Sequence, residues 1–149
     1  MVPQSNANKE KVLFICTHNA ARSQMAEGLL RALYGDRYEV YSAGTEPSIV
    51  SPFAIKALAE IGIDISGHHS KSVEEFFDTK IDHVVTVCDN AKDNCPFFPY
   101  GINYYHKSFQ DPQAFEGNNE EKLNTFRRIR DEIREWIDKN FINEVKATK

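Results

Sequence analysis

The chain has 149 residues, of which 41% are hydrophobic and 27% are charged, a composition typical of one globular domain. Its net charge of −4 and the lack of a long basic stretch exclude the usual pattern of a nucleic-acid-binding protein. No apolar run is long enough to span a membrane, and the polar residues 1–11 are not a secretory signal. We therefore expect the protein to lie in the cytoplasm, where thiols stay reduced. We also expect it to be a monomer.

The first half of the chain alternates apolar runs with helical patterns. Residues 11–16, KVLFIC, are rich in strand formers and fit a buried parallel strand. Residues 23–34 place apolar side chains at helical spacing and are followed by a glycine that ends the pattern. A second strand is predicted at 38–43. The Ser-Pro pair that begins 51–62 is typical of a helix start, and the glycine that closes this segment ends the helix.

The second half continues the same alternation. Residues 73–77 are a short predicted helix, and residues 81–88, IDHVVTVC, are a predicted third strand. A fourth strand is predicted at 102–106. Residues 119–141 form the longest predicted helix, because their apolar side chains recur along one face.

This order of elements predicts an α/β fold of three layers, with a four-stranded parallel sheet between two layers of helices. We expect one catalytic domain, residues 11–142, between flexible segments at 1–10 and 143–149. Ligands of such sheets bind beyond the carboxyl ends of the strands. Cys16 and Cys88 both fall at such ends, which suggests that they meet.

The segment CTHNAARS joins the first predicted strand to the first predicted helix. Five residues between Cys16 and Arg22 are enough to wrap a tetrahedral oxyanion with backbone N–H groups, and the helix N-terminus adds its positive dipole end. Arg22 can grip two oxygens, and this positive field would hold Cys16 as a nucleophilic thiolate near neutral pH. The candidate oxyanion site comprises Thr17, His18, Asn19, Ala20, Ala21, Arg22 and Ser23.

Plainer interpretations of this segment exist. Cys16 could be a buried core residue beside a surface arginine. Asn19 and Ser23, which we expect to brace the loop and the thiolate, could equally belong to ordinary loop and cap chemistry.

Residues 16–28, CTHNAARSQMAEG, resemble the catalytic loop of thioredoxin-coupled arsenate reductases, which share the fold of low molecular weight protein tyrosine phosphatases. The resemblance continues through nearly the whole chain after the first ten residues. It is carried by YSAG at 41–44, GIDIS at 62–66, VVTVC at 84–88, NCP at 94–96, Asp-Pro at 111–112 and RIRDEI at 128–133.

The resemblance implies a relay of three cysteines. Cys16 would attack arsenate, Cys88 would attack Cys16 and release arsenite, and Cys95 would attack Cys88. Thioredoxin would then reduce the final Cys88–Cys95 disulfide, so no cofactor is expected. Arg22 and Asp111 complete the predicted catalytic set.

In the related phosphatases, the position of Asp111 is a general acid that protonates the leaving group. A second interpretation is therefore a phosphatase acting on phosphotyrosine or small phosphomonoesters. Asp111 could also belong to an ordinary Asp-Pro turn. A third class is a redox sensor or arsenite-binding protein without turnover. A zinc site is a weak alternative, because the cysteines and histidines lack finger spacing.

The chain departs from the family pattern in the loop after Cys16 and at one position outside it. His18 stands where glycine is usual, and Ala20 and Ala21 stand where serine and cysteine are frequent. Some members bind potassium beside the loop through positions that match Asn19, Glu27 and Ser42, but their fourth ligand, an aspartate, is Lys71 here. The Lys71 ammonium could occupy the place of the potassium ion, so we expect that no metal is required. Alternatively, Lys71 points into solvent.

Overall fold

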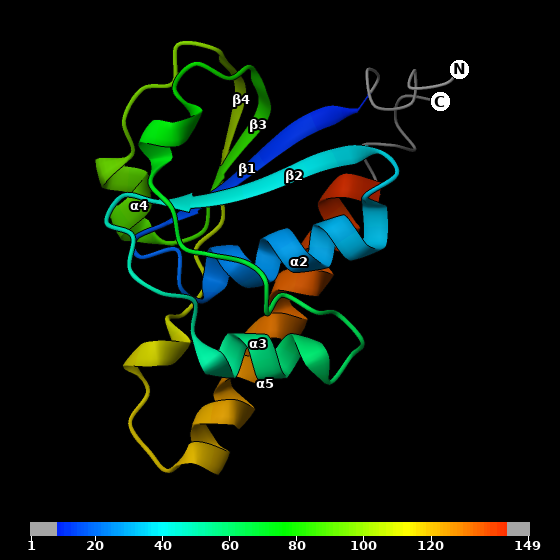
Figure 1. Ribbon diagram of the computed structural model, residues 1–149, viewed down its shortest axis with the longest axis vertical. Coiled ribbons are helices and arrows are strands. Elements are labelled where there is room, and N and C mark those ends of the chain that lie inside the picture. The colour runs from blue at the N-terminus through cyan, green and yellow to red at the C-terminus, as the bar shows by residue number, and fades with distance from the viewer. Residues whose placement is uncertain (1–8, 143–149) are drawn as a thin grey trace.

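A four-stranded parallel sheet lies at the centre of the computed structural model, which describes residues 9–142 (Figure 1). The strands are β1 (Glu10–Cys16), β2 (Tyr38–Gly44), β3 (Ile81–Thr86) and β4 (Gly101–His106), in the order β2-β1-β3-β4. The predicted parallel sheet is confirmed. Residues 1–8 and the predicted flexible tail 143–149 lie outside the described residues.

Within residues 9–142, four α-helices and three shorter helical turns connect and follow these strands. The α-helices are α2 (Arg22–Tyr34), α3 (Pro52–Ala59), α4 (Asp89–Asn94) and α5 (Asn119–Ile137). The 3₁₀ turns are η1 (Val73–Phe76) and η2 (Pro112–Ala114), and a π-helical turn, η3 (Asp138–Ile142), follows α5. None of the helices within residues 9–142 combines the length and the apolar character needed to cross a membrane.

Helices pack on both sides of the sheet, so the predicted three-layer arrangement is confirmed. The helices α2, α3 and α5 lie together on one side (Figure 1). On β2, Tyr38 points to this side, where its ring meets Phe141 at 5.1 Å. Tyr41, three residues further on, points to the other side and packs against Phe76 of η1 at 5.3 Å. This alternation is the two-residue period of a strand buried on both faces.

Local sequence signals explain where the helices begin. Ser51 accepts a hydrogen bond from the backbone N–H of Phe53, and Pro52 occupies the first turn of α3. Asn118 and Glu121 form a reciprocal capping box at the start of α5. These caps fix the ends of two helices that carry the core.

The structure corrects the prediction at the third strand, at α4 and at the end of the longest helix. The third strand ends at Thr86 rather than at Cys88, because Cys88 is the N-cap residue of α4. The backbone N–H of Val87 still donates to Ile15 O at 2.9 Å, so the chain leaves the sheet between these two residues. The helix α4 was not among the predicted elements, since only Ala91 of its six residues is buried and no apolar period marks it. The longest helix ends at Ile137, and the predicted remainder is the π-helical turn.

Candidate active site

The loop between β1 and α2 has its carbonyl groups turned outward. The carbonyl oxygens of Cys16, Thr17, His18 and Ala20 accept hydrogen bonds from backbone N–H groups of residues 45–51, at 2.7–3.2 Å. In a trans peptide unit the C=O and N–H groups point in opposite directions. Because these carbonyl groups point outward to residues 45–51, the N–H groups of the same peptide units point into the loop. That arrangement, at the N-terminus of α2, suits an anion.

Asn19 gives this loop its sharp bend. Its φ of +52° lies in the left-handed region, which asparagine tolerates better than most residues. The end of β2 lies close behind the bend, and a Cβ atom at Gly44 would come within 2.6 Å of Thr17 O and 2.9 Å of Asn19 N. Only glycine therefore fits the end of the YSAG segment without moving the loop.

Cys16 lies at the bottom of the loop with 2% of its surface exposed. Its sulfur is 2.8 Å from Ser23 Oγ, so the expected brace between Ser23 and the thiol is present. Burial raises the pKa of Cys16, and it outweighs the hydrogen bonds from Ser23 and the positive charge of Arg22, both of which lower this pKa. The positive charge therefore acts in the predicted direction, but burial reverses the net shift, and the expectation of a lowered pKa for Cys16 is wrong. Groups that donate to the sulfur have to offset the cost of burial.

Arg22 and Asp111 face each other at one rim of the loop. The Arg22 guanidinium donates to Phe109 O at 3.1 Å and lies 3.7 Å from an Asp111 carboxylate oxygen. Asp111 also caps η2 by accepting from Gln113 N at 3.0 Å. The two predicted catalytic residues are thus brought together, and the turn at 111–112 aims the carboxylate at the rim.

Thr17 connects the loop to Cys88. The buried sulfur of Cys88 is 3.4 Å from Thr17 Oγ1, and the same hydroxyl donates to Asn90 Oδ1 at 3.1 Å. Cys88 also caps α4, because its sulfur accepts from Ala91 N at 3.3 Å. The predicted meeting of Cys16 and Cys88 at the carboxyl ends of β1 and β3 is therefore supported by contacts through the residue next to Cys16.

Cys95 lies at the opposite end of α4. It is half-buried, its sulfur is 3.4 Å from Pro96 O, and burial raises the pKa of its thiol to about 11. It lines a surface hollow with residues of β3 and β4, among them Tyr105 and His106. The structure places Cys95 away from the loop that holds Cys16.

The remaining predicted binding residues differ in what they offer. Ala20 and Ala21 are buried. The His18 side chain is exposed and its Nδ1 lies 2.9 Å from Glu46 O, so it contacts the neighbouring segment. Ser70 Oγ donates to His18 O at 2.8 Å, so His18 is held by its backbone as well as by its side chain.

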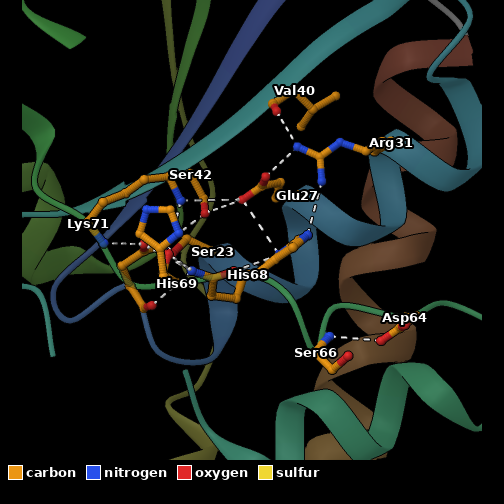
Figure 2. Close-up of polar contacts among 12 residues, drawn as sticks. Ser23, Glu27, Arg31, Val40, Ser42, Asp64, Ser66, His68, His69 and Lys71 are labelled. Carbon is orange, nitrogen blue, oxygen red and sulfur yellow. Dashed lines mark hydrogen bonds and ion pairs between the residues drawn. The ribbon is translucent and has the colours of Figure 1, made fainter. Parts of the chain in front are cut away.

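A buried polar cluster lies behind the loop (Figure 2). Glu27 forms an ion pair with Arg31 and accepts from Ser42 Oγ at 2.5 Å. The Lys71 ammonium is 4.0 Å from Glu27 and donates to His69 O at 3.1 Å. With 13% of its side chain exposed, Lys71 does not point into solvent, and that alternative is wrong. Burial lowers the pKa of Lys71, and Glu27 opposes this shift.

Two residues of this region, Gln24 and His68, were not identified from the sequence. Gln24 is fully buried and bonds to Asn19, while His68 bonds to Gln24. No motif marks them as a pair, because they stand 44 positions apart. Among residues 9–142, no group of three or more His, Cys, Asp or Glu side chains is arranged to hold a metal ion.

Residues 11–149 match the sequence profile of the family described as low molecular weight phosphotyrosine protein phosphatase. The chain belongs to this family. An arsenate reductase of Halalkalibacterium halodurans is 48% identical over 126 residues, which are 85% of this chain and 91% of the relative. The resemblance drawn from the loop motifs is thereby confirmed.

Solved structures agree with this placement. A structure described as an arsenate reductase in the phosphate binding state superimposes with a TM-score of 0.77 at 33% identity, covering 91% of this chain and 98% of that one. A thioredoxin-dependent arsenate reductase of Corynebacterium glutamicum matches with a TM-score of 0.63 at 28% identity, covering 98% of this chain and 66% of that one.

Proposed function

We propose that this protein reduces arsenate to arsenite through Cys16, Cys88 and Cys95, and that thioredoxin regenerates it. The observation that carries the proposal is the position of Cys88 at the mouth of the loop that holds Cys16, with its sulfur 3.4 Å from the Thr17 hydroxyl. A phosphatase of this family needs one thiolate, whereas a two-electron reduction needs a pair of thiols. The similarity to named arsenate reductases supports the same conclusion.

The first step joins sulfur to arsenic. The Cys16 thiolate attacks arsenate, an S–As bond forms and one arsenate oxygen leaves as water after taking up protons. The inward N–H groups of the loop and the guanidinium of Arg22 hold the remaining oxygens and balance their charge.

The second step is the reduction. Cys88 attacks the sulfur of Cys16, an S–S bond forms, and the S–As bond breaks with its electron pair passing to arsenic. Arsenic falls from the +5 to the +3 state and leaves as arsenite. Cys95 then attacks Cys88, and Cys16 departs as a thiolate. A thioredoxin dithiol reduces the resulting Cys88–Cys95 disulfide and is itself oxidised.

The helix α4 has to unfold before the last disulfide can form. Cys88 and Cys95 are seven positions apart, and a regular helix separates such residues by about 10.5 Å along its axis. A disulfide needs Cα atoms within roughly 7 Å. Only Ala91 of α4 is buried, so little core contact opposes the change. Unfolding would also carry the disulfide away from the loop and toward thioredoxin.

A second activity is supported by one observation, the placement of Asp111 at the rim beside Arg22. A carboxyl group in that position could protonate the leaving oxygen of a phosphomonoester held by the loop. We therefore keep hydrolysis of phosphotyrosine or small phosphomonoesters as the alternative function.

All the proposed catalytic residues lie within residues 11–142, and the proposed chemistry needs no residue from a second subunit, so we propose a single catalytic domain that acts as a monomer. Its free thiols suit the reducing cytoplasm.

The test is steady-state turnover with reduced thioredoxin as the only reductant. Arsenate-dependent oxidation of thioredoxin, with arsenite as product, supports the proposal. Hydrolysis of p-nitrophenyl phosphate without any arsenate-dependent oxidation would instead support the phosphatase. Binding of arsenite without either turnover would support a sensor or binding protein.

A further inference from the structure

A fully buried glutamine connects the loop around Cys16 to a second loop. The side-chain nitrogen of Gln24 lies 3.2 Å from Asn19 O, 3.0 Å from Asn19 Oδ1 and 3.1 Å from His69 O. Two of these partners are backbone carbonyl oxygens, which only accept hydrogen bonds, so the amide NH₂ group must face them. Of its two hydrogens, one is directed at His69 O and the other is shared between Asn19 O and Asn19 Oδ1. Gln24 Oε1 therefore points the other way, to His68 Nδ1 at 2.9 Å, and Nδ1 carries a proton.

The other ring nitrogen of His68 has the opposite role. His68 Nε2 lies 3.0 Å from NH1 of Arg31, and a guanidinium can only donate. The imidazole is therefore the neutral Nδ1–H tautomer. Figure 2 shows its contact with Arg31. The pKa of His68 is lowered, mainly by burial and also by the charges of Arg31 and Lys71. The carboxylates of Glu27, 3.9 Å away, and of Asp64 oppose this shift in the pKa. A second ring proton would meet the guanidinium directly.

The orientation of Asn19 is fixed in the same way. Its Oδ1 accepts from the backbone N–H of Lys71 at 3.0 Å, so its NH₂ group faces Ser23 Oγ at 2.7 Å and Ser42 Oγ at 3.0 Å. Because Ser23 Oγ receives this hydrogen bond, its own hydrogen is available to the Cys16 sulfur at 2.8 Å. A thiolate sulfur can only accept.

We infer that Gln24 and His68 are positioning residues for the Cys16 thiolate. Four hydrogen bonds in series, each donating toward the sulfur, run from His68 through Gln24, Asn19 and Ser23 to Cys16. Hydrogen bonds in series polarise one another, so each outer donor strengthens the final bond to sulfur. The inference rests on Cys16 as the reacting thiol of the proposed relay. It adds a route by which a histidine on a separate loop sets the reactivity of that thiol.

The experiment measures the alkylation rate of Cys16 by iodoacetamide against pH, in a Cys88→Ser/Cys95→Ser background where Cys16 is the only thiol. His68→Leu removes the outermost donor at a partly exposed position, and we expect the rate near neutral pH to fall about threefold. His68→Asn keeps an N–H group near the place of Nδ1 and should restore most of the rate. All variants should reach the same rate at alkaline pH, where the thiolate is fully formed.

Two further variants complete the test. Gln24→Met breaks the chain closer to the sulfur and should lower the neutral rate more than His68→Leu does. His69→Leu is the matched control, because His69 contributes only its backbone carbonyl oxygen, and its profile should match the parent. The inference is overturned if the His68→Leu profile superimposes on the parent, or if its rate falls equally at every pH, which would indicate restricted access. No step uses arsenate, so loss of the proposed reductase function would leave this result interpretable.

Discussion

The hydroxyl of Thr17 lies 3.4 Å from the sulfur of Cys88, which places a second thiol at the mouth of the loop formed around Cys16. The same hydroxyl holds Asn90, the second residue of α4, at 3.1 Å. One threonine therefore connects the candidate oxyanion site to α4, the helix that would unfold in the proposed relay.

Replacing the cysteines one at a time should separate the two activities. Cys88→Ser and Cys95→Ser should each lower reductase turnover on the order of a thousandfold or more, and leave hydrolysis of p-nitrophenyl phosphate largely intact. Cys16→Ser should abolish both, because a hydroxyl in this site stays protonated and is a weak nucleophile. Parallel assays of thioredoxin oxidation and phosphate release measure the effect. Equal loss of both activities in the Cys88 and Cys95 variants would contradict separate roles.

Lys71 should make the protein independent of potassium. Its ammonium lies 4.0 Å from Glu27, where it supplies the positive charge that a bound cation would bring. Turnover should be the same in potassium and sodium chloride at equal ionic strength. Lys71→Asp should introduce activation by potassium, because it places a second carboxylate beside Glu27.

Lys71→Gln is the control for that variant, since it removes the charge without adding an anionic ligand and should show weaker dependence on potassium. A Lys71→Asp variant that responds equally to both salts would rule out the exchange of ammonium for cation.

Cys95 should be a poor nucleophile while α4 is folded. Burial raises its pKa to about 11, above the ordinary value, so the thiolate fraction is small at neutral pH and grows as pH rises toward 11. In a Cys16→Ser/Cys88→Ser background, alkylation of the folded protein should follow that titration. A midpoint near the value of a free thiol, about 8.5, would mean that Cys95 is already exposed before the relay begins.

Oxidation should change the structure around α4 and little else. Amide hydrogen exchange should differ strongly between the reduced and oxidised forms at residues 89–98. Residues 12–15 of β1 and residues 129–137 of α5 should change little, because these segments carry buried core side chains. Unchanged exchange at 89–98 would show that the Cys88–Cys95 disulfide does not form by unfolding of this segment.

The sequence predicted those strands, helices and loops whose structure follows from one local pattern of residue types. The run KVLFIC had to be a buried strand, since Val12, Leu13, Phe14 and Ile15 have no exposed surface in the sheet. The loop from Cys16 to Ser23 was recognisable from its residue types and its place between a strand and a helix. The helix α4 escaped prediction because most of its residues are Asp and Asn, which favour turns, and its cap is a cysteine sulfur rather than a usual capping side chain.

Contacts between distant segments that no motif marks could not be predicted. Gln24 has the sequence context of an ordinary helix residue, and its burial depends on the second loop bringing His68 and His69 to it. The direction of the shift in the pKa of Cys16 was missed for a related reason. Positive groups near the thiol are visible in the sequence, but the depth of its burial, which outweighs them, is set by the packed structure.

A single turnover without thioredoxin tests the relay most directly. Fully reduced protein is mixed with excess arsenate, arsenite is counted, and the disulfides are mapped after trapping the free thiols. The account predicts one arsenite per protein molecule, a Cys88–Cys95 disulfide and a free Cys16. Formation of no arsenite, or a final disulfide that contains Cys16 while Cys95 stays reduced, would contradict it.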